Sequence, residues 1–182
     1  MPDANLRHHL RHASSALHQQ LDTSLGELTT KLDYSRYVQK THCFRFALER
    51  ALLSADSVDW QVDPISDLAA EDLADLEVTS LPHANVPVRE WTRSSYLGAL
   101  YVLEGSSLGA RLLFRRAEAL GMTMDFGARH LAHLAADHQR WRNFVEILET
   151  IPVEQHETAL DGVLDVFRFA LSIYREPAHE CA

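Results

Sequence analysis

The chain has 182 residues, of which 46% are hydrophobic and 24% are charged, values of an ordinary globular domain rather than a disordered segment. A single domain spanning residues 1–182 is the simplest organisation at this length. The formal net charge of −9 argues against a general attraction to nucleic acid or to anionic membrane surfaces, so we expect neither as a partner. We find no signal-peptide pattern and no apolar run of membrane-spanning length, and therefore expect a cytoplasmic protein.

The hydrophobic pattern is helical along the chain, because apolar residues recur at spacings of three and four, and it predicts an all-α fold. A first helix is predicted over residues 5–22 and a second over residues 34–53, with Gly26 as the break before the second. Each carries a continuous apolar face, so we expect the two helices to pack against each other.

A short helix is predicted over residues 65–76, with Asp63 as its N-cap and Pro64 at its first position. Pro82 and Pro87 then mark a loop.

The stretch 90–120 reads as one long helix with three glycine interruptions, at Gly98, Gly105 and Gly109. Gly121 and Gly127 mark its exit. Another helix follows around residues 141–148, and a last one opens at Pro152 and runs to residue 174.

His18 is the first candidate for chemistry, because it lies beside the apolar stripe of the first predicted helix. Arg11 lies two turns before it and Asp22 one turn after it, on the same helix face. A neutral imidazole is a good iron ligand when its second nitrogen donates to a carboxylate, and Asp22 could orient it in this way. The spacing also fits a partly buried structural histidine, so it leaves both interpretations open.

Gly105 and Gly109 form the second constellation, since they lie four residues apart on one helix face. Glycine costs roughly 1 kcal/mol relative to alanine inside a helix, so the pair indicates that something approaches the backbone closely. A flat ligand and a tightly crossing helix both satisfy this pattern.

Two segments carry a family resemblance. The sequence EGSSLGA, which begins at Glu104, resembles the distal-helix signature of bacterial heme oxygenases, and FGARHL, which begins at Phe126, resembles a loop motif of their proteobacterial branch. Three further segments are similar to that family in its order and spacing: 16–22, 141–148 and 167–169. On these five matches the chain is identified as a member of the heme oxygenase family.

The resemblance implies a helical bundle that holds heme between the first helix and a kinked distal helix. It assigns His18 as the proximal iron ligand and places Gly105 and Gly109 over the opposite face, where bare backbone leaves room for dioxygen. It counts Gly105, Ser106 and Gly109 as catalytic. Ser106 stands where animal-type members carry an aspartate, which changes the polar group available there.

The resemblance also implies the remaining contacts and reactants. Arg11 and Tyr101 would bind the heme propionates, with Arg142 as a weaker third candidate. Heme b would be both substrate and cofactor, consumed with dioxygen and with electrons from a reduced ferredoxin or a flavin reductase. The products would be biliverdin, carbon monoxide and ferrous iron, for iron acquisition or for supply of a bilin chromophore.

Three other functions are also compatible with parts of the sequence. The 11 histidines would permit a metal site, for example at His8 and His12 or among residues 130, 133 and 138, although His130 reads better as a structural turn residue. A protein that binds or delivers heme without degrading it would use the same His18 and glycine pocket. The thiamine-degrading branch of this architecture needs a nucleophilic cysteine, for which Cys43 has no supporting motif. Cys43 and Cys181 also form no disulfide framework.

Overall fold

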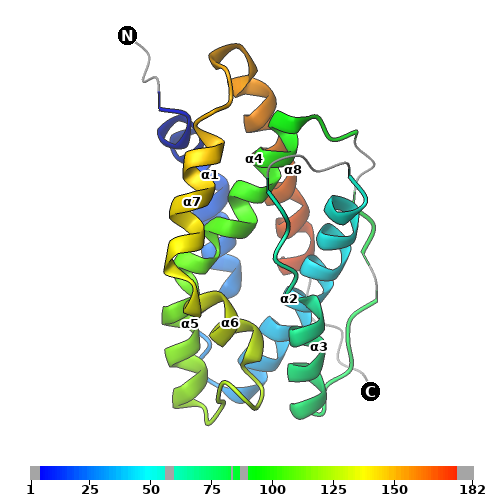
Figure 1. The fold of residues 1–182 in the computed structure, drawn as a ribbon. Helices are drawn as coiled ribbons and strands as arrows, with labels where there is room; N and C mark the ends of the chain where they lie inside the picture. Colours follow the sequence, from blue (N-terminus) through cyan, green and yellow to red (C-terminus); the bar gives the residue numbers. More distant parts are fainter. Residues whose placement is uncertain (1–4, 56–59, 83, 87–89, 176–182) are drawn as a thin grey trace.

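The computed structural model describes residues 5–55, 60–82, 84–86 and 90–175 (Figure 1). The predicted positions Pro87 and Cys181 lie outside these residues. Within the described part the regular structure is helical, so the predicted all-α class is confirmed. The helices are α1 (Leu6–Leu25), α2 (Lys31–Leu53), α3 (Ser66–Asp75), α4 (Arg93–Gly105), α5 (Ser107–Ala119), α6 (Arg129–Ala136), α7 (His138–Leu148) and α8 (His156–Tyr174), with a 3-10 turn η1 (Val153–Gln155) before α8.

Helix α8 organises the core, because it packs closely on α4 and also contacts α1 and α2. The first two helices were predicted to pack against each other, but in the described residues each packs mainly on other helices. Helix α1 packs on α8 and on α7, whereas α2 packs on α3 and α8. The buried side of α8 runs through Val163, Phe167 and Ala170, and it supplies the apolar surface that both helices need.

Local signals account for the boundary between α1 and α2. Gly26 follows the last residue of α1 with φ of +70°, a left-handed backbone that favours glycine, so the predicted break is confirmed. Thr30 and Asp33 form a reciprocal capping box, in which each side chain accepts from the backbone amide of the other. This box starts α2 three residues before the predicted position.

Helix α3 begins later than its predicted cap implies, because Asp63 does not cap it. Its N-cap is Ile65, and the carboxylate of Glu49 on α2 accepts from the backbone amides of Ile65 and Ser66 at 3.0 and 3.1 Å. The same Glu49 pairs with Arg45 at 2.6 Å. A neighbouring helix thus supplies the cap that the local sequence was expected to provide.

The N-terminus of α1 also receives a carboxylate from another helix, in addition to its own cap. Asn5 caps α1 through its own side chain, which accepts from the amide of His8. Glu149, at the end of α7, accepts from the amides of Leu6 and Arg7 at 3.0 Å each. The carboxylate therefore anchors the start of α1 to α7 and also favours the positive end of the α1 dipole.

The predicted long helix 90–120 is divided in two at Ser106, between α4 and α5. Gly121 and Gly127 both adopt positive φ, +90° and +74°, at the turn that follows. Helix α6 then begins inside the segment predicted as a loop motif. None of the described helices is long and apolar enough to cross a membrane.

Candidate active site

The imidazole of His18 lies on an exposed face of α1, with 63% of its side chain accessible to solvent. Its Nδ1 lies 2.9 Å from a carboxylate oxygen of Asp22, the i+4 contact expected from the sequence. The ring edge also meets Phe167 of α8, with the ring centres 5.8 Å apart. With Nδ1 held by Asp22, Nε2 is the nitrogen left to coordinate a metal.

Arg11 and Tyr101 come from different helices, α1 and α4, and the charge of Arg11 acts on the Tyr101 hydroxyl. Tyr101 on α4 is half-buried, and burial raises the pKa of its hydroxyl, while the positive charges of Arg11 and Arg7 on α1 act in the opposite direction. Seven residues span almost two full turns of a helix. Arg11 and His18 therefore lie on the same side of α1.

Arg142, the third predicted propionate ligand, lies on α7 and is exposed. Its chain neighbour Trp141 packs against Tyr101, with ring centres 5.6 Å apart. Among the described residues no contact joins Arg142 to Arg11 or to Tyr101, so its assignment stays a prediction.

The glycine pair at the α4–α5 junction has no packing role. A Cβ on Gly105 would meet only the ring of Trp141, at an ordinary 3.7 Å, and a Cβ on Gly109 would meet nothing within 4 Å. Tight helix crossing is instead the role of Gly98 and Gly162, whose added Cβ atoms would lie 2.0 and 2.1 Å from backbone oxygens of the facing helix. The helix-crossing interpretation of Gly105 and Gly109 is therefore wrong.

The hydroxyls next to these glycines bond to their own helix. Ser106 donates to the carbonyl of Leu103 and Ser107 to the carbonyl of Glu104, each at 2.6 Å. Hydroxyls that bond back to the preceding turn bend helices, which is consistent with the break at this point. The proton of Ser106 is in use, so its oxygen is available chiefly as an acceptor.

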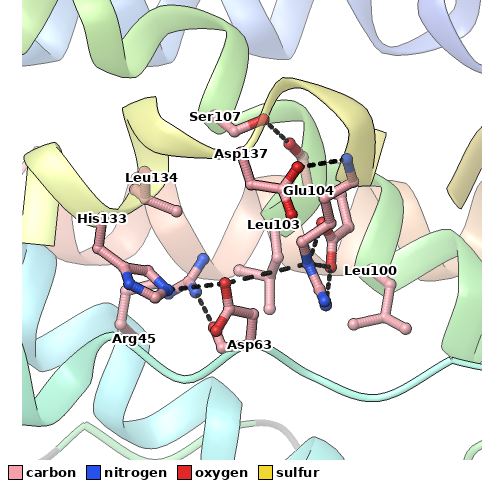
Figure 2. Close-up of a pocket in the computed structure, with 10 residues that line it drawn as sticks. Arg45, Asp63, Leu100, Leu103, Glu104, Ser107, His133, Leu134 and Asp137 are labelled. Atoms are coloured by element: carbon pink, nitrogen blue, oxygen red, sulfur yellow. Dashed lines mark hydrogen bonds and ion pairs between the residues drawn. The ribbon is translucent and has the colours of Figure 1, made fainter. Parts of the chain in front are cut away.

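A polar pocket of about 20 Å³ lies beside the junction (Figure 2). It is lined by Leu100, Leu103, Glu104 and Ser107 of α4 and α5, by Arg45 of α2, and by Asp63, His133, Leu134, Asp137 and Arg140. This volume suits about one water molecule and is far too small for a porphyrin.

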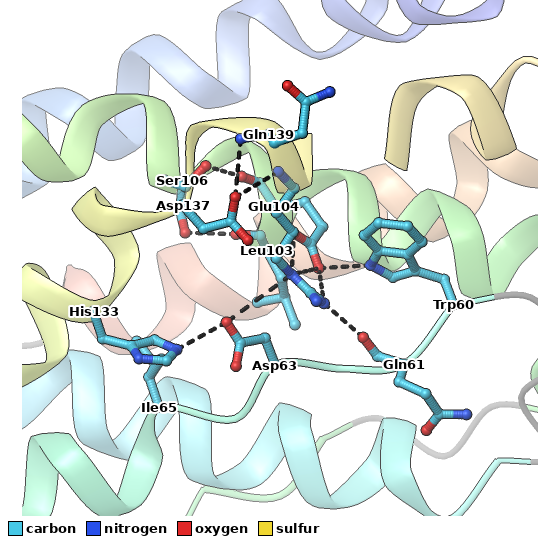
Figure 3. A network of polar contacts seen from close by, with 12 residues as sticks. Trp60, Gln61, Asp63, Ile65, Leu103, Glu104, Ser106, His133, Asp137 and Gln139 are labelled. Carbon is cyan, nitrogen blue, oxygen red and sulfur yellow. Dashed lines mark hydrogen bonds and ion pairs between the residues drawn. The ribbon is translucent and has the colours of Figure 1, made fainter. Parts of the chain in front are cut away.

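Glu104 is the centre of the polar network around this pocket (Figure 3). Its carboxylate accepts from Nε1 of Trp60 at 2.8 Å and from Nη2 of Arg140 at 2.6 Å. Nearby, Asp63 pairs with Nε2 of His133 at 2.9 Å, which is the role it has in place of capping α3.

His130 has a structural environment, in agreement with the reading from the sequence. It is fully buried in α6, and its Nδ1 lies 2.6 Å from the equally buried Asp72 of α3. Among the described residues no group of three or more histidine, cysteine, aspartate or glutamate side chains is arranged to hold a metal ion.

Comparisons with known proteins decide the family. A model of the heme oxygenase family matches residues 69–176. The heme oxygenase PigA of Pseudomonas aeruginosa is 33% identical over 162 residues, which cover 82% of this chain and 81% of the relative. The chain belongs to the heme oxygenase family. The resemblance found in the sequence is thereby confirmed.

A solved structure supports the same assignment for the fold. The crystal structure of the NO- and CO-bound heme oxygenase from Neisseria meningitidis matches with a TM-score of 0.72 and 26% identity, covering 94% of this chain and 90% of the other. The predicted heme oxygenase fold is therefore confirmed along nearly the whole chain.

The residues of this heme oxygenase fit a heme. Besides the imidazole and the Arg11–Tyr101 pair, the face of α5 that continues from Gly105 and Gly109 presents Leu108 and Leu112, which are 65% and 56% exposed. Exposed leucines beside bare backbone form an apolar surface suited to a flat ring. Nitrogen donor, cation and apolar surface are the three kinds of contact that heme requires.

Sequence reasoning missed the network around Glu104 in this heme oxygenase. A signal was present in the sequence, because Glu104 directly follows Val102 and Leu103 in an apolar turn. A carboxylate next to a buried residue such as Leu103 needs a cation or several hydrogen-bond donors. The partner is Arg140, which lies three residues after Asp137, the N-cap of α7. The pairing could not be predicted, because the two residues are far apart in the sequence.

Proposed function

We propose that this chain binds heme b between α1 and the α4–α5 junction, and opens it oxidatively to biliverdin, carbon monoxide and ferrous iron. Members of this family are oxidoreductases acting on heme. The observation that carries the assignment of the site is the geometry of His18. Its Nδ1 is held 2.9 Å from Asp22, on the α1 face whose Arg11 charge acts on Tyr101 of α4.

Each of these side chains has a proposed role. His18 presents Nε2 to the iron, and Asp22 fixes the tautomer and strengthens the imidazole as a ligand. Arg11 and Tyr101 bind the propionates, which sets the rotation of the ring in its plane. Arg142 extends this group from α7. The bound heme supplies the iron at which dioxygen is reduced and the ring that is oxidised.

On the side of the heme opposite His18, the α4–α5 junction contributes through the absence of large or strongly acidic or basic side chains. Gly105 and Gly109 leave room above the iron, and Ser106 presents an acceptor oxygen rather than a strong acid or base. A histidine or arginine in this position would favour cleavage of the O–O bond as in peroxidases and divert oxidation away from the ring. Electrons come from a reduced ferredoxin or a flavin reductase in the cytoplasm.

The test is turnover by the purified protein. Addition of hemin, an electron donor and air should give a Soret band that decays as a biliverdin spectrum appears. His18→Ala should weaken heme binding and abolish turnover, while the matched variant His12→Ala, which removes an exposed histidine of the same helix, should behave as wild type. Stable heme under turnover conditions would favour a carrier protein, and normal turnover by His18→Ala would reject the ligand assignment.

A further inference from the structure

Glu104 is the most strongly held polar side chain at the junction of α4 and α5. Only 7% of it is exposed, and three hydrogen-bond donors of two residues converge on its carboxylate. Nε1 of Trp60 lies 2.8 Å away (Figure 3). Nε and Nη2 of Arg140 lie at 2.9 and 2.6 Å. Two contacts to one guanidinium define an orientation as well as a distance.

Arg140 is also held by contacts other than that with Glu104. Its Nη2 also donates to the carbonyl of Gln61 at 2.6 Å, and its guanidinium lies over the ring of Trp60, 4.9 Å from the ring centre. The backbone amide of Arg140 donates to Asp137, the N-cap of α7, at 2.9 Å. The ion pair thus joins three segments: the last turn of α4, the first turn of α7 and residues 60–61.

The residues next to this pair in the chain belong to the proposed heme site. Gly105 follows Glu104, and Trp141 follows Arg140. The Trp141 ring lies 3.7 Å from where a Cβ of Gly105 would be and packs on Tyr101 with ring centres 5.6 Å apart. Tyr101, Glu104 and Gly105 all lie on α4, whereas Arg140 and Trp141 lie on α7. A change in the Glu104–Arg140 distance would therefore move Gly105 and Tyr101 relative to Trp141.

We propose that Glu104 and Arg140 are positioning residues, whose ion pair fixes the α4 side of the α4–α5 junction against α7 and residues 60–61 and thereby selects the meso carbon that is oxidised. This inference rests on the proposed function. Glycine leaves room for dioxygen but does not direct it, since bare backbone has no side chain to bias one direction. Direction must come from where the backbone is held, and Glu104 is the side chain adjacent to Gly105 that holds it.

The primary variant is Glu104→Gln, which keeps the shape and an acceptor for Trp60 but turns an amide group toward the Arg140 guanidinium. In the heme-free protein we expect the backbone amides of residues 106–109 to exchange with deuterium about three- to tenfold faster. The Soret band and the heme affinity should stay near those of wild type. The proportion of minor biliverdin isomers should rise by about threefold or more, because a tenfold change in a rate ratio needs only 1.36 kcal/mol.

Two further variants test whether the pair acts as a unit. Arg140→Met should shift the isomers in the same direction, and the double variant should shift them no further than either single change. Trp60→Phe removes one donor while retaining most of the ring, and should give a smaller shift of the same kind. It decides the question if Glu104→Gln does not fold.

Asp75→Asn is the matched control. Asp75 pairs with Arg129 and accepts from the amide of Gly127, so this change removes a comparable partly buried ion pair at the packing of α3 on the turn before α6. It should lower stability without altering the isomers or the exchange of residues 106–109.

Unchanged isomers and unchanged exchange in Glu104→Gln and Trp60→Phe would reject the inference, as would an equal isomer shift in Asp75→Asn. Failure of the wild-type protein to degrade heme would instead reject the proposed function, so the two failures are distinguishable.

Discussion

Glycine has opposite roles at nearby positions of the same helical run. At Gly98 the missing side chain is a packing requirement, because a Cβ would lie 2.0 Å from the carbonyl oxygen of Ala159. At Gly109 no atom lies within 4 Å of that position, and the backbone is not left-handed. Residue type alone does not separate these two roles, but the surroundings do.

Gly109→Ala should therefore separate stability from activity. We expect the free energy of unfolding to be unchanged or raised by up to about 1 kcal/mol, because alanine is the better helix former. Biliverdin formation should fall by roughly tenfold or more, because the methyl group would fill space reserved for dioxygen. Urea unfolding and heme turnover measure the two quantities. Normal turnover would show that the face of Gly109 is not above the iron.

The buried carboxylate of Asp72 gives stability a defined pH dependence. Burial alone would raise its pKa, but the hydrogen bond and charge of His130, with backbone amides of residues 129 and 130, lower it overall. A carboxyl group whose pKa is lower in the folded state stabilises the fold above its unfolded value of about 3.9, and this contribution is lost as pH falls through the folded pKa.

Asp72→Asn should accordingly be less stable than wild type by about 2 kcal/mol or more at neutral pH, since it leaves buried donors poorly matched. The difference should shrink below about pH 4, where the Asp72 carboxylate of the wild-type protein becomes protonated. Chemical unfolding of both proteins from neutral pH down through this range measures it. A difference that grew on acidification would contradict the assigned direction of the pKa change.

At the scale of elements, α4 and α8 share the most extensive packing of any two described helices, with a glycine of each at their crossing. Gly98 and Gly162 face the backbone of the opposite helix, at Ala159 and Ser95 respectively. Gly98→Ala should push the helices apart and cost about 3 kcal/mol, which corresponds to a fall in melting temperature of roughly 6–12 °C for a chain of this size. Calorimetry of this variant beside Gly109→Ala tests it, and equal melting temperatures would show that the crossing can relax.

The helix boundaries show which features of the fold could be predicted from the sequence. Periodicity predicted α1, α2 and α3 to within three residues at each end, because local capping and hydrophobic spacing act over one or two turns. The cap of α3 was misassigned because its acceptor, Glu49, lies on another helix. The roles proposed for His18, Gly105 and Gly109 come from the family resemblance. The Glu104–Arg140 pair joins residues 36 positions apart and has no local pattern in the sequence.

For the whole molecule, bound heme would connect α1 to the α4–α5 junction, two parts that are otherwise joined mainly through α8. Helix α1 packs on α8 and α7, while the α4–α5 junction is held by α8, α7 and residues 60–61. A ligand bound by α1 on one side and by α4 and α5 on the other adds a connection that the unfolded chain cannot make. Binding must therefore raise the stability of the entire domain.

The melting temperature should rise when heme is added, even without an electron donor. At a free heme concentration of 100 times the dissociation constant the gain is about 2.7 kcal/mol, or roughly 5–10 °C for a chain of this size. His18→Ala should lose most of this shift at the same heme concentration, because it binds more weakly, while His12→Ala should retain it. Glu104→Gln should also retain it, since the ion pair is assigned to direction rather than to affinity. An equal shift in His18→Ala would mean that heme binds away from α1, and would overturn the site while leaving the fold as described.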